Sequence, residues 1–106
     1  MTAYAVAVIR ETRFGEEIKE YLRRIDDTLA PYSGEYRIHG GPYELLEGAW
    51  SSELIVIAFP SMKQARDWYE SDAYRAIRSL RVEHTEGDVL LVQGVPEGHK
   101  GADILD

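Results

Sequence analysis

The sequence predicts a single α+β domain, because short runs of alternating apolar residues are separated by two stretches with helical spacing. At 106 residues, with 44% hydrophobic and 29% charged residues, the chain has the size and composition of one globular domain. Strands are predicted at 3–10, 36–39, 54–59 and 88–95, and helices at 14–29 and 61–80. This order is typical of the ferredoxin-like βαββαβ fold, with a four-stranded antiparallel sheet and both helices on one face.

The first strand and the first helix differ clearly in their apolar periodicity. Residues 3–10 are apolar at both alternating sets of positions, so this strand is expected to be covered on both faces. Over 14–29 the spacing becomes helical, and negative charge in the first turn, at Glu16 and Glu17, suits the helix dipole. The segment from Pro31 to Gly34 is expected to end this helix.

The second strand is the only one with a charged face. Glu35, Arg37 and His39 alternate along it, which predicts an edge strand beside solvent or a ligand. Gly40 to Pro42 then interrupt the strand, and the alternation is expected to resume over residues 43–47.

The third strand, the second helix and the last strand complete the domain. Residues 54–59 are again apolar on both faces, and Ser61 to Gln64 have the spacing of a capping box that opens a helix. Helical spacing pauses at Ser71 and Asp72, which predicts a kink or a new N-cap. The last strand, 88–95, ends a domain of residues 1–95, and residues 96–106 are expected to form an extended C-terminal tail.

Three of the four strands are apolar on both faces, yet two helices can cover only one face of the sheet. No other stretch of the chain is long enough to cover the second face. Soluble monomers rarely expose so large an apolar surface. The sequence therefore predicts a homodimer in which two copies pack sheet to sheet.

Composition excludes several classes of function. A net charge of −7 and a pI near 4.9 disfavour nucleic acid as a partner. The absence of cysteine excludes disulfides and thiolate chemistry by this chain and suits the cytoplasm. The apolar runs are too short to span a membrane, and the basic start of a signal peptide is absent, so a cytoplasmic protein without membrane contact is expected.

His39 is the strongest candidate for chemistry, since an imidazole beside a Gly-Gly pair can act as general acid or base in a pocket. The alternative is a partly exposed histidine on an edge strand. Tyr69, Tyr74 and Arg81 suit recognition of a small acid, because arginine clamps carboxylates and tyrosine donates hydrogen bonds. Trp50, on a predicted loop, would form a wall of the pocket. In the alternative, the aromatic residues pack in the core and the arginine is solvated.

Cofactor and metal motifs are missing from the sequence. His39, His84 and His99 lack partners at metal-ligand spacing, so no metal site is expected. The chain has neither a G-x-G-x-x-G motif nor a P-loop, and we expect no cofactor.

Several motifs together carry a resemblance to a known family. They are Gly34-x-Tyr36, His39-Gly40-Gly41, Leu46-Glu47-Gly48-x-Trp50, Phe59-Pro60-Ser61, Trp68-Tyr69-x-Ser71-x-x-Tyr74, Leu80-Arg81 and residues 89–94. Over residues 3–95 the chain resembles the bacterial family known as domain of unknown function 1330, in the dimeric α+β barrel superfamily. The resemblance implies a homodimer with a cleft between helices and sheet in each subunit. Arginine is commoner in the family where this chain has His39.

The superfamily implies several kinds of activity, since its members include cofactor-free monooxygenases, muconolactone isomerases and haem-dependent enzymes. The first interpretation is a small-molecule-binding homodimer that acts, without a cofactor, on a small apolar or aromatic acid by proton transfer. His39 would be the acid or base, and Arg81 the anchor for the anion. The alternatives are a ligand sensor or accessory subunit without catalysis, and a haem or metal protein.

Overall fold

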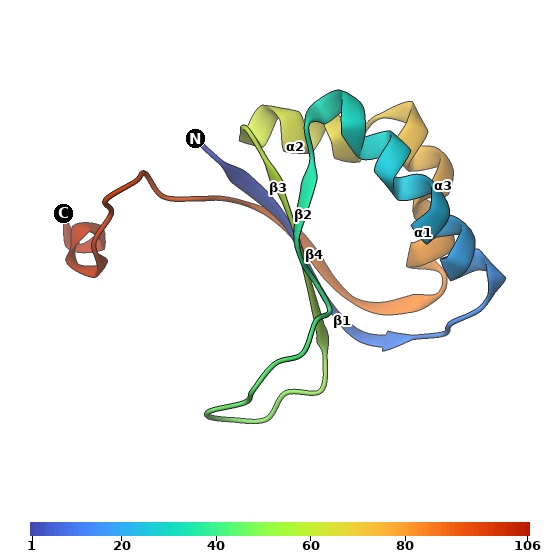
Figure 1. Cartoon of the computed structure of the whole chain (residues 1–106), viewed down its shortest axis with the longest axis horizontal. Coiled ribbons are helices and arrows are strands. Elements are labelled where there is room, and N and C mark those ends of the chain that lie inside the picture. The colour runs from blue at the N-terminus through green and yellow to red at the C-terminus, as the bar shows by residue number, and fades with distance from the viewer.

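The computed structural model describes residues 1–106 and follows the predicted order of strands and helices (Figure 1). The main elements are β1 (Ala3–Thr12), α1 (Glu16–Leu29), β2 (Glu35–His39), β3 (Glu53–Phe59), α2 (Met62–Tyr69), α3 (Asp72–Val82) and β4 (Thr85–Gln93). There are also two short 3-10 helices. η1 (Ala30–Tyr32) directly follows α1, and η2 (Gly101–Leu105) lies near the C-terminus.

The four strands form one antiparallel sheet in the order β2-β3-β1-β4. The helices lie on one face of it, which confirms the ferredoxin-like fold (Figure 1). β2 lies at an edge, as its charged face predicts, whereas β4 lies at the other edge although its sequence was predicted to be apolar on both faces. The sequence pattern thus identifies one edge strand, and strand pairing decides the other.

Serine side chains start both parts of the second helical segment. The Ser61 hydroxyl accepts a hydrogen bond from the Gln64 amide at 3.2 Å, and Ser71 accepts one from the Tyr74 amide at the same distance. Each bond satisfies an amide that would lack a partner at a helix start. The pause at Ser71 is therefore a new N-cap, and it divides the segment into α2 and α3.

The predicted continuation of the second strand over residues 43–47 is wrong, because residues 41–52 form no strand. Gly40 adopts a φ of +63°, which turns the chain out of the sheet after its amide has bonded the Leu54 carbonyl at 2.9 Å. The alternation beyond it has no neighbouring strand to pair with, and every residue from 41 to 51 is exposed. We call residues 40–52 the β2–β3 loop.

The end of the chain also differs from expectation. β4 begins at Thr85, three residues earlier than predicted, and ends at Gln93. The tail is not extended throughout, since it folds into η2, where the Asp103 carboxylate accepts a hydrogen bond from the Lys100 amide at 2.9 Å.

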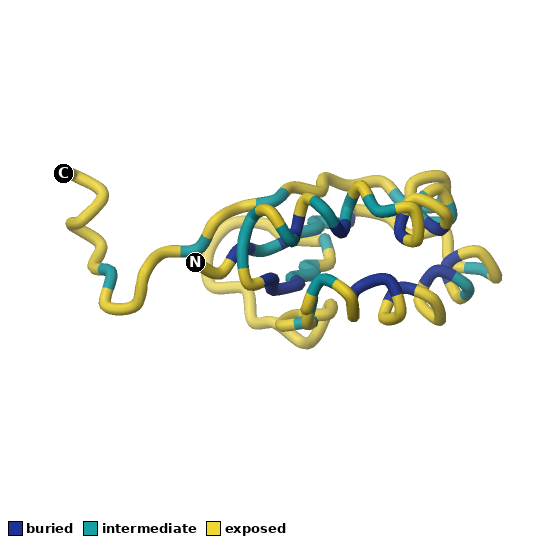
Figure 2. The backbone as a smooth tube through the Cα atoms, turned by 90° about the horizontal axis from the view of Figure 1, so that it is seen from above, coloured by how far each residue is buried: buried dark blue, intermediate teal, exposed yellow.

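The core lies between the sheet and the helices, with the tail exposed along almost all of its length (Figure 2). Aromatic side chains dominate this core. The Trp68 ring lies 4.2 Å from the Tyr74 ring and 5.3 Å from Phe59, measured between centroids. The Trp68 indole also donates to the Thr28 hydroxyl at 3.0 Å, and Thr28 in turn donates to the Ile25 carbonyl. The buried polar atoms of this cluster are thus satisfied.

The opposite face of the sheet is apolar and uncovered. Strand register places Val6 beside Val56 and Leu90 on this face, with Ala5, Ile57 and Leu91 on the helix side. The apolar residues of this face are Tyr4, Val6, Val8, Ile38, Leu54, Val56, Ala58, Leu90 and Val92. Asp88, which pairs with Val8, and Glu35, which pairs with Ala58, lie on the same face, on the two edge strands. Leu90 is 49% exposed, and Ile38 and Val92 are also exposed. We call this surface the open face. Its composition is that of a buried surface and not of a solvated one.

Candidate functional site

A cleft opens between the sheet and the helices at the end of the body where β1 ends and α1 begins. Its inner part is an apolar cavity of about 60 Å³, and an outer part of about 360 Å³ leads to the surface. Both parts share Tyr21, Leu22, His39, Ile55 and Arg81 in their walls, so they form one continuous site. We call it the Arg81 cleft. His39 and Arg81 are the basic residues of the inner wall, which contains no acidic residue.

Arg81 and two tyrosine hydroxyls form a chain of hydrogen bonds inside the cleft. The Arg81 Nε donates to the Tyr74 hydroxyl at 3.4 Å, and the Tyr74 and Tyr21 hydroxyls lie 2.7 Å apart. Tyr74 accepts from Arg81 and keeps a second lone pair, so either tyrosine hydroxyl can be the donor in the Tyr21–Tyr74 pair. Two linked hydroxyls thus lie beside the Arg81 guanidinium, and both tyrosines line the inner cavity.

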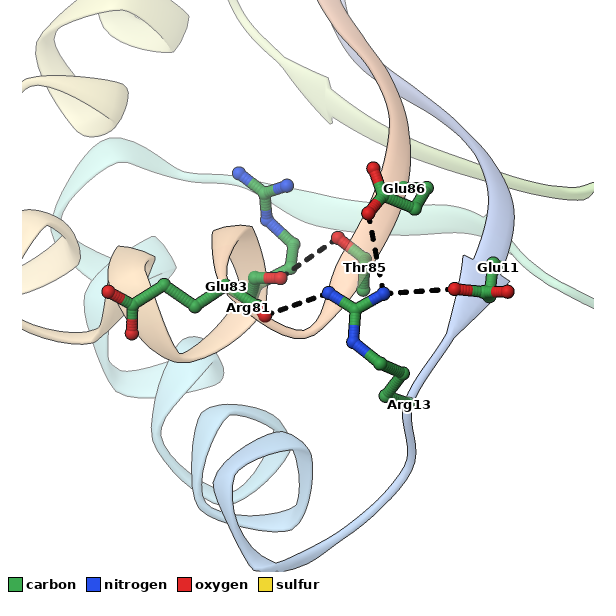
Figure 3. Close-up of polar contacts among 6 residues, drawn as sticks. All are labelled: Glu11, Arg13, Arg81, Glu83, Thr85 and Glu86. Carbon is green, nitrogen blue, oxygen red and sulfur yellow. Dashed lines mark hydrogen bonds and ion pairs between the residues drawn. The ribbon is translucent and has the colours of Figure 1, made fainter.

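Arg81 forms no ion pair with a carboxylate. In Figure 3 its guanidinium points away from Arg13 and from Glu11 and Glu86, the carboxylates that Arg13 bridges. The side chain is only partly exposed, so the charge is incompletely solvated as well as unpaired. A partly buried cation of this kind is an anchor for an anionic group.

The backbone around Arg81 is held by contacts from Arg13, which follows β1, and from Thr85 in β4. Arg13 donates to the Glu83 carbonyl at 2.9 Å, and its own amide donates to the His84 carbonyl at 2.8 Å. The Thr85 hydroxyl donates to the Arg81 carbonyl at 2.9 Å (Figure 3). These bonds fix the end of α3 against the sheet, and Arg81 is therefore positioned before any ligand arrives.

The electrostatics of the cleft keep its arginine charged and its tyrosines neutral. Burial opposes the charge of Arg81, but the hydroxyls of Tyr74 and Tyr21 beside it raise its pKa above the ordinary value. Burial, followed by the neighbouring Tyr74, raises the pKa of Tyr21. Burial, with Asp26 and Tyr74 as smaller causes, raises the pKa of Tyr36 to about 12. Near neutral pH the cleft therefore offers one fixed positive charge and neutral hydroxyl donors.

Because both tyrosine pKa values are raised by folding, stability should fall at alkaline pH. The unfolded chain loses phenolic protons near pH 10, whereas folded Tyr36 retains its proton until about pH 12. The stabilising contribution is therefore complete below pH 10 and is lost as the pH rises through the folded pKa. Urea unfolding midpoints measured up to pH 12 should decline from about pH 10 upward, and the decline should be shallower in Tyr36→Phe. Identical profiles for the variant and the original protein would contradict this assignment.

His39 lies at the junction of the two parts of the cleft. Its ring stacks on Tyr36, with 4.5 Å between centroids and 15° between planes. The bulge between Tyr36 and Ile38 brings both rings to the helix side of the sheet, since β2 would otherwise alternate them to opposite faces. Glu53 shares the outer wall with His39, and a Cβ at Gly40 would lie 3.1 Å from the Glu53 carboxylate. Glycine after His39 thus serves both the turn and this close approach.

The structure brings three of the predicted site residues together, namely His39, Tyr74 and Arg81. Trp50 instead lines a separate groove formed by the β2–β3 loop. Tyr69 is outside the cleft wall. Its ring is tilted against Tyr74, with 5.5 Å between centroids, and the Arg78 guanidinium lies over the Tyr69 ring, 4.8 Å from its centroid.

Sequence reasoning missed three residues of the cleft: Tyr21, Tyr36 and Glu53. Tyr21 lies on the apolar stripe of α1, where an aromatic residue is indistinguishable from core. The positions of Tyr36 and Glu53 depend on the bulge in β2 and on strand register. Only Tyr36 had a signal in the sequence. It precedes His39 by three residues, so a bulge between them would place both side chains on the same face of the strand.

The structure contains no group of three or more His, Asp or Glu side chains arranged to hold a metal ion. His84 has a structural environment, with its Nδ1 2.8 Å from the Leu80 carbonyl. No helix in the chain is both long enough and apolar enough to cross a membrane.

The fold and the site together define a ferredoxin-like α+β domain with a cleft beneath its helices and an uncovered sheet face. The sequence matches the family described as Domain of unknown function (DUF1330) over residues 2–95, and the chain belongs to that family. This confirms the resemblance predicted over residues 3–95. No match was found among curated proteins.

Solved structures share the fold at low sequence identity. A dimeric ferredoxin-like protein of unknown function from Jannaschia sp. is 14% identical, with a TM-score of 0.66, and the match covers 89% of this chain and 100% of that one. Methylated RPA0582 from Rhodopseudomonas palustris is 15% identical, with a TM-score of 0.66 and coverage of 92% and 84%. SnoaB, a cofactor-independent oxygenase from Streptomyces nogalater, is 9% identical, with a TM-score of 0.54 and coverage of 93% and 96%.

Proposed function

We propose that this protein is a homodimer that binds a small organic acid with an apolar or aromatic body in the Arg81 cleft. In the proposed reaction His39 exchanges a proton with the bound acid, and no cofactor takes part. The observation that carries the proposal is the unpaired, partly buried guanidinium of Arg81 at the junction of an apolar cavity and its opening.

The chemistry of the wall supports an acid over a neutral or cationic ligand. A carboxylate or phenolate at Arg81 would receive charge-assisted hydrogen bonds from the guanidinium and a further bond from one of the two linked tyrosine hydroxyls. The remaining wall is aliphatic and aromatic, including Ile55 and Ile57 from β3, and suits the apolar part of the ligand.

The place of His39 supports proton transfer. Its ring is exposed and stacked on Tyr36, and it has no hydrogen bond to another side chain, so both ring nitrogens are available to a ligand. It lines the same walls as Arg81, so an acid held there presents its apolar body to the imidazole. The fold is compatible with catalysis without a cofactor, since SnoaB is described as a cofactor-independent oxygenase.

The open face supports the homodimer. It is apolar along the central strands, and no other part of the chain covers it. A second copy would cover it through a two-fold interface of like surfaces. The Jannaschia protein of the same fold is described as dimeric.

Ligand binding is tested with matched pairs of small aromatic and aliphatic carboxylic acids and their neutral amides, in a thermal shift screen. The acids should raise the melting temperature of the original protein, and their amides should not. Arg81→Met should weaken binding of any acid found by roughly tenfold or more, because hydrogen bonds to charged groups contribute about 1.5–3 kcal/mol. Arg78→Met is the matched control, since Arg78 packs on Tyr69 outside the cleft.

Two results would contradict the role of Arg81: equal stabilisation by acids and amides, or equal losses in the two arginine variants. Proton transfer is tested separately, by following exchange of carbon-bound hydrogen of a bound acid with deuterium in D₂O by NMR. His39→Ala should slow this exchange by about 10²–10⁴-fold while the acid still binds. An acid that binds but never exchanges or changes would favour the sensor function over the enzyme.

A further inference from the structure

Two parts of the chain project from the sheet on the side away from the helices (Figure 1). One is the C-terminal tail, residues 94–106, and the other is the β2–β3 loop. They leave from opposite ends of the strands, because Gln93 pairs with Ala3 at the start of β1 and Glu53 pairs with Ile9 toward its end. The two projections therefore flank the open face, one at each end.

The tail is folded but makes no polar contact with the body beyond its first residue. The Gly94 amide donates to the Thr2 carbonyl at 2.8 Å, and from there on the hydrogen bonds stay within the tail. At its tip Ile104 and Leu105 are 77% and 82% exposed. An adjacent aliphatic pair on a structured 3-10 helix, held away from its own core, is suited to bury against another surface.

The β2–β3 loop forms a groove of about 670 Å³ on the same side of the sheet. Its walls include Pro42, Leu45, Leu46 and Trp50, and Leu46 is 85% exposed. Glu44, Glu47 and Glu53 also line the groove, so its apolar part is the patch formed by these four residues. In one copy, however, the groove and the tip of the tail lie at opposite ends of the sheet.

The tail follows the edge strand β4 and the loop follows the edge strand β2, so the two lie at diagonally opposite corners of the sheet. A two-fold axis that lies between two packed open faces, perpendicular to the line joining these corners, would bring the tail of each copy to the loop of the other. We propose that the tail tip of each copy, Ile104 and Leu105, binds in the β2–β3 groove of the second copy. The contact is made twice, as an isologous interface requires, and it is continuous with the open face. This inference rests on the proposed homodimer and adds to it an exchanged arm that locks the pair.

The absence of cysteine from the chain makes the contact testable by crosslinking. Leu46→Cys and Ile104→Cys are prepared separately, and the two are unfolded and refolded together, then treated with a short bis-maleimide. The mixture should give covalent dimers, and neither variant alone should do so. The double variant should also give a covalent dimer and not an internally linked monomer.

Each other outcome overturns the proposal in a distinct way. Crosslinking of Ile104→Cys alone would show that tails meet tails, and a linked monomer of the double variant would show a tail folded onto its own groove. A mixture without crosslinks would show no contact. Light scattering of the original protein distinguishes failure of the homodimer from failure of the exchanged arm. A monomer mass would contradict both proposals, whereas a dimer mass without crosslinks would contradict only the exchanged arm.

A second test measures the dissociation constant of the dimer. Ile104→Lys should raise the dimer dissociation constant by roughly tenfold, the ratio that corresponds to about 1.4 kcal/mol. Val82→Lys introduces the same charge at an exposed aliphatic residue at the end of α3, on the helix side, and should leave the constant unchanged. Equal constants for the two variants would contradict the role of the tail.

Discussion

Leu90→Lys should convert the protein from dimer to monomer at micromolar concentration. Leu90 lies on the edge strand β4, beside Val6 on the open face, and is 49% exposed. The substitution should therefore change the folding stability of the monomer little, because the lysine side chain remains in water. In the dimer it would place a charge from each copy in an apolar interface, and a buried unpaired charge is strongly unfavourable.

We expect the dissociation constant to rise by at least about a hundredfold, which corresponds to roughly 2.7 kcal/mol. Light scattering or sedimentation across a dilution series measures the effect, and circular dichroism verifies that the fold is kept. Val82→Lys is again the control for the added charge. If Leu90→Lys and the original protein have the same mass at every concentration, the open face is not the dimer interface.

Trp68→Ala should cause the largest loss of stability from a single substitution. The side chain is 3% exposed and contacts Phe59, Tyr69 and Tyr74, and its indole satisfies the Thr28 hydroxyl. Removing it leaves a cavity and takes away a hydrogen-bond partner of Thr28. We expect a loss of about 3–5 kcal/mol, a large share of the 5–15 kcal/mol that is typical of a domain.

The chain has one other tryptophan, and it provides the matched control. Trp50 is 38% exposed, and its only hydrogen bond is through its backbone carbonyl, which accepts from the Tyr43 hydroxyl at 3.4 Å. Trp50→Ala should therefore cost only about 0.5 kcal/mol in a urea titration. Comparable losses in the two variants would mean that Trp68 is not the centre of the core.

The sequence allowed most of the fold to be predicted, because each strand and helix has its own periodicity. A break at Ser71 or Asp72 was predicted from a pause in the helical spacing, and the structure assigns the N-cap to Ser71. The edge position of β2 was predicted from its charged face. The prediction over residues 43–47 failed because alternation is a local property, whereas a strand needs a neighbour to bond. The site was predicted in part: His39, Tyr74 and Arg81 share a cleft, and Trp50 and Tyr69 lie elsewhere.

By itself, the sequence determined the order of elements and the family of this protein, and the apolar character of both sheet faces. Those features depend on spacing along the chain. Only the tertiary structure decided that Arg81 lacks a carboxylate, that the Tyr21 hydroxyl bonds the Tyr74 hydroxyl beside it, and that the tail and the β2–β3 loop flank the open face. These features depend on distances between residues far apart in sequence. They are set by strand register and by the bulge in β2, which no local pattern specifies.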